Sequence, residues 1–285
     1  MGLDFAARQL LNGATMSLLL ILISLGLSVV YGLMRMLNMA HGEFFILGAF
    51  SVVWLNELRL SFWLGLVVAP VFLGLFGYLI QRVLVKFLYD KPNATILATW
   101  GLGMIIRQAL QIIMGPRPHI IPSPLAGSVH LLGVDYPAYR LFVIAAGSVL
   151  IAIIVWLYLG TTFGLEIRAA IYNRELTSAL GINTERINAI SFVVGSALAG
   201  LAGAMLCPLV NVAPLTGLNY LIKVFFVIIV GGAGSLLGTV VGGIIIGGGE
   251  SLLQMILSPL GAEIGILVIA VVIISLRPRG LISSR

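Results

Sequence analysis

Arg107 and Glu250 are the ionisable residues that lie deepest within apolar stretches of this sequence. A charge at the centre of a bilayer costs at least ~2.5–3.5 kcal/mol, so such a residue normally faces a cavity or a partner. Each is followed four residues later by a glutamine, Gln111 or Gln254. These four side chains are candidates for lining the path of a polar solute. Two other interpretations stay open: a structural ion pair inside a bundle, and a position at a membrane interface.

A second polar island is the segment Asn38-Met39-Ala40-His41-Gly42-Glu43-Phe44. Asn38 can cap a helix, because its side-chain oxygen accepts a backbone N–H. Glu43 opens an apolar run, where a carboxylate is favoured near the positive end of the helix dipole. Helix capping is the simplest explanation of these residues. The functional alternative places Asn38, His41 and Glu43 in a gate or in a translocation path.

The sequence lacks the motifs of nucleotide, metal and acyl-transfer chemistry. The glycine-rich segment 231–239 has no phosphate-loop lysine and is predicted to be a tight turn. His41, His119 and His130 lie in different segments, and no G-x-S-x-G motif is present. The single cysteine, Cys207, excludes an internal disulfide and a cysteine-rich metal site. We therefore expect no metal, no cofactor and no enzymatic activity on this chain.

The composition indicates a membrane protein. Hydrophobic residues make up 60% of the 285 residues and charged residues 9%, whereas soluble domains carry about 25% charged residues. Long apolar runs without strand-like alternation exclude a β-barrel. Despite the net charge of +6, no basic cluster with aromatic residues suggests nucleic-acid binding. The chain is predicted to be an all-α, polytopic transmembrane helical bundle, in a single domain over residues 1–285.

Apolar stretches of about 20 residues predict eight or nine membrane spans. The second and the seventh are short, so each is a candidate for a broken or re-entrant helix, which needs protein or a water-filled cavity around it. The predicted spans are 12–33, 43–57, 62–81, 93–114, 139–160, 189–209, 220–232, 235–257 and 262–276.

Basic residues predict the orientation, because Lys and Arg accumulate in cytoplasmic loops. Nine crossings put the two ends of the chain on opposite sides. Ten basic residues then share the side of the C-terminus, against four on the other side. We therefore predict an outer N-terminus and a cytoplasmic C-terminus in a bacterial inner membrane. The ten are Arg35, Arg82, Lys86, Lys91, Arg168, Arg174, Arg186, Arg277, Arg279 and Arg285; the four are Arg8, Arg59, Arg117 and Arg140.

Small residues recur at four-residue spacing in two predicted spans. Gly195, Ala199 and Gly203 form one such ladder, and Gly238 and Gly242 belong to another. In a bilayer, small residues let helix backbones approach closely where no hydrophobic effect drives association. These positions are therefore predicted to pack helices together.

A polar segment at about 166–186 interrupts the apolar stretches near the middle of the chain. Residues 168–180 are predicted to form a short amphipathic helix, with Gly181 at the glycine position that follows a helix. Thr184 is predicted to cap the next span. Mixed charges and small residues favour a helix that lies in a partner's groove over one that lies on the lipid surface.

Four stretches of the sequence resemble the permease subunits of ABC importers of the branched-chain amino acid type. The resemblance extends from about residue 12 to residue 282. The matching stretches are Asn38–Phe50 (NMAHGEFFILGAF), Asn173–Pro208 (NRELTSALGINTERINAISFVVGSALAGLAGAMLCP), Val230–Gly238 (VGGAGSLLG) and Arg277–Leu281 (RPRGL).

The resemblance implies a subunit that transports by alternating access and whose energy comes from partners. These would be a second, related permease, two cytoplasmic ATPase subunits that bind ATP and Mg²⁺, and an extracytoplasmic solute-binding protein. It also implies that the central segment couples the chain to an ATPase. The importer pattern begins Glu-Ala-Ala, whereas Arg174-Glu175-Leu176 stands here, so the later glycine part matches better. The implied coupling residues are Arg174, Glu175, Ala179, Leu180, Gly181 and Asn183.

The solute stays open between two small nitrogenous classes. The stretches 124–128 (PLAGS), 139–141 (YRL) and 217–220 (GLNY) look more like the urea and short-amide branch than the leucine-type branch of the family. An ion-coupled secondary transporter or a channel is the alternative function. It would need carboxylates or histidines along the path, and it would leave the central polar segment unexplained.

Overall fold

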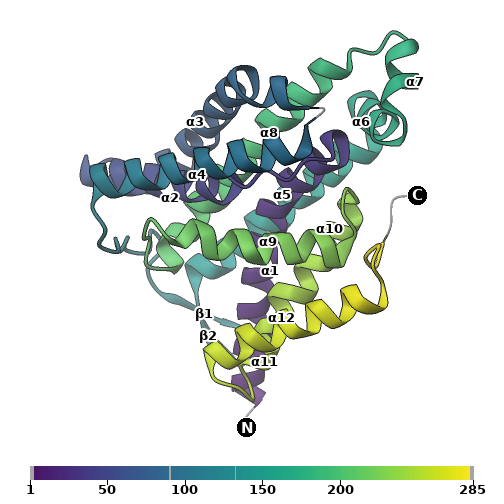
Figure 1. Ribbon diagram of the computed structural model, residues 1–285. Coiled ribbons are helices and arrows are strands. Elements are labelled where there is room, and N and C mark those ends of the chain that lie inside the picture. Colours follow the sequence, from purple (N-terminus) through teal and green to yellow (C-terminus); the bar gives the residue numbers. More distant parts are fainter. Residues whose placement is uncertain (1–2, 90, 132, 283–285) are drawn as a thin grey trace.

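The computed structural model describes residues 3–89, 91–131 and 133–282, and these residues fold into a helical bundle (Figure 1). Arg285, counted above among the basic residues, lies outside them. Seven segments of the described chain are long and apolar enough to cross a membrane, which confirms the helical membrane fold. The helices are α1 (Leu3–Met34), α2 (His41–Glu57), α3 (Phe62–Val83), α4 (Pro92–Met114), α5 (Ala138–Gly160), α6 (Thr162–Tyr172), α7 (Arg174–Ala179), α8 (Thr184–Leu206), α9 (Thr216–Gly231), α10 (Leu236–Gly243), α11 (Gly249–Leu253) and α12 (Pro259–Leu276).

Two further helices, α2 with 17 residues and α9 with 16, correspond to the two short spans predicted from the sequence. Both are continuous, so the expected break does not occur in them. It occurs in the eighth span, where a wider π-helical turn at Ile244–Gly248 separates α10 from α11. Glycines at 242, 243, 247, 248 and 249 surround this turn. Glycine is a poor helix former, which explains why the helix deforms at this point.

The buried core lies where α1, α2 and α8 cross. A side chain at Gly195 of α8 would place its Cβ 2.9 Å from the carbonyl oxygen of Gly26 in α1. One at Gly203 would meet the backbone of α2 at Phe45 and, 3.0 Å away, at the nitrogen of Ala49. These helices therefore pack backbone against backbone, as the small-residue spacing predicts.

The remaining predicted packing positions also lie at helix contacts. Ala199 is fully buried in α8. A Cβ at Gly238 of α10 would lie 2.8 Å from the carbonyl carbon of Gly231 at the end of α9, and one at Gly242 would lie 3.1 Å from the nitrogen of Gly231. The glycine-rich turn between α9 and α10 thus joins two closely packed helices.

The proline-rich stretch 115–137, before α5, forms no helix in its described residues but contains a short antiparallel hairpin, β1 (Ser128–Leu131) and β2 (Val134–Pro137). Tyr136 of β2 donates a hydrogen bond to the side-chain oxygen of Asn12 in α1, at 3.0 Å, and Arg140 contacts the same oxygen at 2.7 Å. The hairpin therefore sits beside the N-terminal part of α1. Figure 1 shows α6 and α7 at the far end of the molecule from the N-terminus.

The last described turn, which includes Pro278 and Arg279, shares a pocket with Arg35 at the end of α1 and with Arg168 of α6. The start of α1 and this last described turn therefore lie at opposite ends of α1, with the turn beside the central polar segment. Which of these ends faces the cytoplasm stays a prediction.

Candidate functional site: a coupling segment and two ion-pair clusters

The central polar segment forms two helices, so the prediction of one helix over 168–180 is wrong. Asn173 has extended backbone angles (φ −152°, ψ 103°) between α6 and α7. Its side-chain oxygen accepts the backbone N–H of Leu176 at 2.9 Å, and its carbonyl accepts the hydroxyl of Thr177 at 2.8 Å. Asparagine at such a cap accepts a backbone N–H from the first turn of the new helix, which has no acceptor within that helix. Asn173 therefore ends α6 and starts α7.

Gly181 ends α7 in the left-handed conformation, with φ +85°. Its N–H bonds the carbonyl of Ser178 at 3.0 Å, and the N–H of Ile182 bonds that of Thr177 at 3.3 Å. A glycine at this position avoids the strain that a Cβ would impose, as the sequence predicts. The cap of α8 is Asn183, which accepts from the N–H of Arg186 at 2.9 Å. The assignment of that cap to Thr184 is therefore off by one residue.

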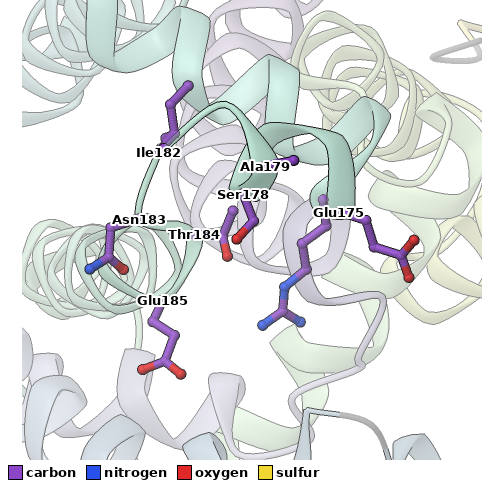
Figure 2. A pocket seen from close by; sticks show the side chains of 9 residues that line it. Glu175, Ser178, Ala179, Ile182, Asn183, Thr184 and Glu185 are labelled. Carbon is purple, nitrogen blue, oxygen red and sulfur yellow. The ribbon is translucent and has the colours of Figure 1, made fainter.

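A cleft of about 820 Å³ opens on this segment. Figure 2 shows the carboxylates of Glu175 and Glu185 on opposite sides of it, with Ser178 and Thr184 between them. Next to the cleft, the side chains of Leu176 and Leu180 are 56% and 73% exposed. Exposed leucines beside a polar cleft are typical of a protein-docking surface. Every predicted coupling residue except Leu180 lines the cleft: Arg174, Glu175, Ala179, Gly181 and Asn183.

The segment between α3 and α4 holds α7 and α8 in place. The guanidinium of Arg174 lies 5.4 Å from the centre of the Tyr89 ring, a cation–π contact. The ammonium of Lys86 lies 3.2 Å from a carboxylate oxygen of Glu185. Burial raises the pKa of the Tyr89 phenol, so the ring stays neutral under Arg174. The cleft is therefore supported from the neighbouring turn.

The polar island around Asn38 lies at the start of α2. Asn38 accepts the N–H of Ala40 at 3.0 Å, so it forms a turn before the helix and is not its cap residue. A ring nitrogen of His41 lies 2.9 Å from the carbonyl oxygen of Ile23 in α1. The contact of His41 with Ile23 places the start of α2 beside the second half of α1, well before that helix ends.

Glu43 and Arg107 form a buried ion pair between α2 and α4. The carboxylate of Glu43 is 1% exposed and accepts from Nε of Arg107 at 3.0 Å and from its Nη2. The second carboxylate oxygen of Glu43 has no hydrogen-bond partner among the described residues. This oxygen could accept an N–H group that enters between α2 and α4.

Glu250 belongs to a separate cluster with Lys223 and Glu263. The ammonium of Lys223 in α9 lies 2.9 Å from both carboxylate oxygens of Glu250 in α11, and 3.2 Å from one of Glu263 in α12. Arg107 and Glu250, which share the same spacing to a glutamine, therefore pair with other residues and not with each other. Lys223 was recognisable in the sequence as a charge within a span, but no spacing connects it to Glu263.

Gln111 and Gln254 are both half-buried, and neither side chain has a hydrogen bond to the residues that the structure describes. The backbone N–H of Gln254 donates to the carbonyl of Glu250 at 3.1 Å, which is an ordinary helical hydrogen bond. The seven predicted path residues are thus not one site. Four gather around the start of α2, namely Asn38, His41, Glu43 and Arg107, and Glu250 lies in the second cluster.

Comparison of the sequence with known proteins places this chain in a transport family. The family described as branched-chain amino acid transport system, permease component, matches residues 9–276. The high-affinity branched-chain amino acid transport system permease protein LivH of Escherichia coli strain K12 is 27% identical over 291 residues, covering 96% of this chain and 94% of LivH. A probable branched-chain amino acid transport permease protein LivH of Methanocaldococcus jannaschii is 30% identical over 270 residues, covering 90% of this chain and 84% of that protein.

A second permease of the Escherichia coli system, LivM, is 25% identical over 225 residues, covering 70% of this chain and 52% of LivM. No solved structure matches the chain. The family match covers nearly the whole length, and it favours neither an ion-coupled transporter nor an enzyme. The chain belongs to the permease component family of branched-chain amino acid ABC importers and is an integral membrane transport subunit.

Proposed function

We propose that this permease carries a small nitrogenous solute inward by alternating access, and that an ATPase subunit drives it through α6 and α7. The observation that supports this role is the cleft on α7 with Leu176 and Leu180 exposed beside it. A conformational change on one subunit can move another only through contacts that differ between two states. α7 offers such a contact, because it is tied to α6 at Asn173 and to α8 through the turn at Gly181.

The proposed assembly contains a second permease, two ATPase subunits and a solute-binding protein. LivH and LivM are both named as permease proteins of one type of transport system, and both are similar to this chain. That similarity supports a pair of related permeases at the centre of the complex. ATP and Mg²⁺ would bind the ATPase partners, which supply the free energy. No nucleic acid takes part.

The proposed orientation puts α7 and the C-terminus in the cytoplasm and the N-terminus outside. Basic residues gather at the α7 end of the bundle, where Arg35, Arg168 and Arg279 line one pocket. The positive-inside preference assigns this end to the cytoplasm. The hairpin beside the N-terminal part of α1 would then face the solute-binding protein.

The proposed path for the solute passes the start of α2. The free carboxylate oxygen of Glu43 can accept an N–H from a solute, while Arg107 donates to the other oxygen. Both amino acids and short amides carry such N–H groups. The Lys223 cluster is instead assigned to holding α9, α11 and α12 together, because Lys223 of α9 contacts a carboxylate on each of the other two helices.

Two solute classes remain candidates within this proposal. The names of the relatives, which are 25–30% identical to this chain, support branched-chain amino acids. The urea-like stretches 124–128, 139–141 and 217–220 support urea or a short amide. In the structure Tyr139 is buried, with its hydroxyl on the carbonyl of Met205 at 2.7 Å, so this part of the resemblance concerns packing and not solute contact.

The test is solute-stimulated ATP hydrolysis by the assembled complex. The permease is purified with its partner permease and ATPase subunits, reconstituted in liposomes, and supplied with the solute-binding protein and either leucine or urea. We expect one of the two solutes to increase hydrolysis and to be taken up. Uptake by this chain alone, driven by an ion gradient and without ATPase subunits, would overturn the proposal.

A further inference from the structure

A basic pocket of about 620 Å³ lies at the α7 end of the bundle, between the end of α1, α6 and the turn that follows α12. Three arginines line it: Arg35, Arg168 and Arg279. Among the described residues, none of the three forms a salt bridge with a carboxylate. Tyr31, Tyr158 and Tyr172 complete a rim of aromatic hydrogen-bond donors. Such a site has a strong excess of positive charge.

The Arg168 side chain is held by the end of α5. Its guanidinium bonds the carbonyl of Tyr158 and lies 5.4 Å from the centre of that residue's ring. Arg35, directly after α1, and Arg279, after α12, bring two further guanidinium groups to the same pocket. Three guanidinium groups without a carboxylate partner among the described residues favour an anion in the pocket.

A separate apolar groove of about 410 Å³ lies next to this pocket, toward the span region. It runs between α1, α5 and α8, and Tyr158 lines both cavities. Along α1 the groove residues Leu25 and Val29 are followed directly by the pocket residues Tyr31 and Arg35. Val194 of α8 lines the groove and is 46% exposed. The groove is therefore reachable from the lipid side.

We infer that the two cavities together bind one anionic phospholipid, with its phosphate among Arg35, Arg168 and Arg279 and an acyl chain in the groove. Guanidinium groups form strong charge-assisted hydrogen bonds with phosphate. A basic pocket between helices at the membrane surface is the site that anionic head groups recognise. The apolar groove distinguishes a lipid from a free phosphate or an acidic protein, because neither would fill it.

The location beside α6 gives the lipid a role in transport. Arg168 is in the helix that leads to α7, so a phosphate bound there ties α6 to the end of α1 and to the C-terminal turn. The assignment of this site to the cytoplasmic side of the membrane rests on the proposed function. The inference that the site binds lipid does not, since lipid binding is measured without solute or ATP.

The test measures phospholipid retention by the assembled complex. The complex is stripped of lipid in detergent, titrated with phosphatidylglycerol or phosphatidylcholine, and examined by native mass spectrometry. We expect phosphatidylglycerol to bind preferentially. Replacing two arginines, in the double variant Arg35→Gln and Arg279→Gln, should weaken binding about thirtyfold, since each arginine near a membrane surface contributes about fivefold.

Matched variants separate the contribution of the arginine charges to lipid binding from the contribution of the apolar groove. The double variant Arg82→Gln and Lys91→Gln removes two basic residues at the same predicted side and should leave binding unchanged. Val194→Trp fills the groove without changing charge and should weaken binding, whereas Val67→Trp, on the exposed face of α3 (62% exposed), should not.

Four results would overturn the inference. They are equal retention of both lipids, equal losses in the two charge variants, displacement of the lipid by inorganic phosphate, and dissociation of the ATPase subunits from the Arg35/Arg279 variant. The last two would identify a free-phosphate site and a protein contact, respectively. A complex that binds the lipid but shows no solute-stimulated hydrolysis would instead refute only the proposed function.

Discussion

The helix crossing at the core and the segment α6–α7 both depend on glycine, but for different physical reasons. At the core, Gly26, Gly195 and Gly203 leave no room for a Cβ, because another helix backbone occupies that space. At the end of α7, a Cβ on Gly181 would meet nothing within 4 Å, and only the positive φ requires glycine. The comparison teaches that one residue type maintains the fold in one region and shapes an exposed turn in the other.

Gly203→Val is expected to have the largest effect. The valine side chain would collide with the backbone of α2, and overpacking of this kind costs about 3 kcal/mol or more. We expect little folded protein, measured by size-exclusion chromatography in detergent and by thermal unfolding. Gly101→Val is the matched control, because nothing lies within 4 Å of that position. A wild-type Tm for Gly203→Val would contradict the close packing of α8 on α2.

Arg107→Gln is expected to be the next most damaging change. It leaves the carboxylate of Glu43, which is 1% exposed, without its cation, and breaking a buried pair costs about 3 kcal/mol. Thermal unfolding of the purified protein measures the loss. Lys223→Gln should cost less, because Glu263 in that cluster is 40% exposed and remains hydrated. Equal losses in the two variants would show that burial does not distinguish the clusters.

Gly181→Val should separate coupling from stability. The β-branched side chain at φ +85° strains the turn by about 1–3 kcal/mol, so the docking conformation of α7 is depopulated by about thirtyfold at the middle of that range. We expect solute-stimulated ATP hydrolysis to fall by a similar factor while the protein stays folded. Gly181→Asn should retain more activity, because asparagine tolerates the left-handed conformation. Wild-type uptake by the valine variant would remove Gly181 from the coupling role.

Lys86→Gln should have the smallest effect. The ion pair with Glu185 has side chains that are 48% and 63% exposed, and such pairs contribute about 0.5 kcal/mol or less. We expect thermal unfolding and stimulated hydrolysis close to wild type. A large loss of hydrolysis in this variant would indicate that Lys86 contacts the ATPase directly.

Much of the fold was predictable because apolar run length determines where a chain can cross a bilayer. The short helices α2 and α9 illustrate this, since both appear within a few residues of their predicted bounds. The break at Asn173 was missed, although asparagine is a common cap residue, because the helical pattern of 168–180 continues on both sides of it. The pattern alone does not show whether an asparagine inside such a run caps a new helix or lies within one continuous helix.

The ion-pair partners could not be predicted from local spacing. Glu43 and Arg107 are 64 residues apart, and Lys223 and Glu250 are 27 apart. These contacts exist only once α2 has packed near α4 and α9 near α11. The coupling surface was easier to locate, because its polarity stands out against the apolar chain on both sides. Its role stays a prediction.

The most direct test asks whether α7 faces the cytoplasm and is covered by an ATPase. Ser178→Cys introduces an exposed thiol beside the cleft, while the native Cys207 is fully buried and does not compete. In membrane vesicles that contain the assembled transporter, we expect a membrane-impermeant maleimide to label Cys-substituted α7 only in inside-out vesicles, and only after the ATPase subunits are removed. Labelling from the outer side, or equal labelling with and without the ATPase subunits, would contradict the account.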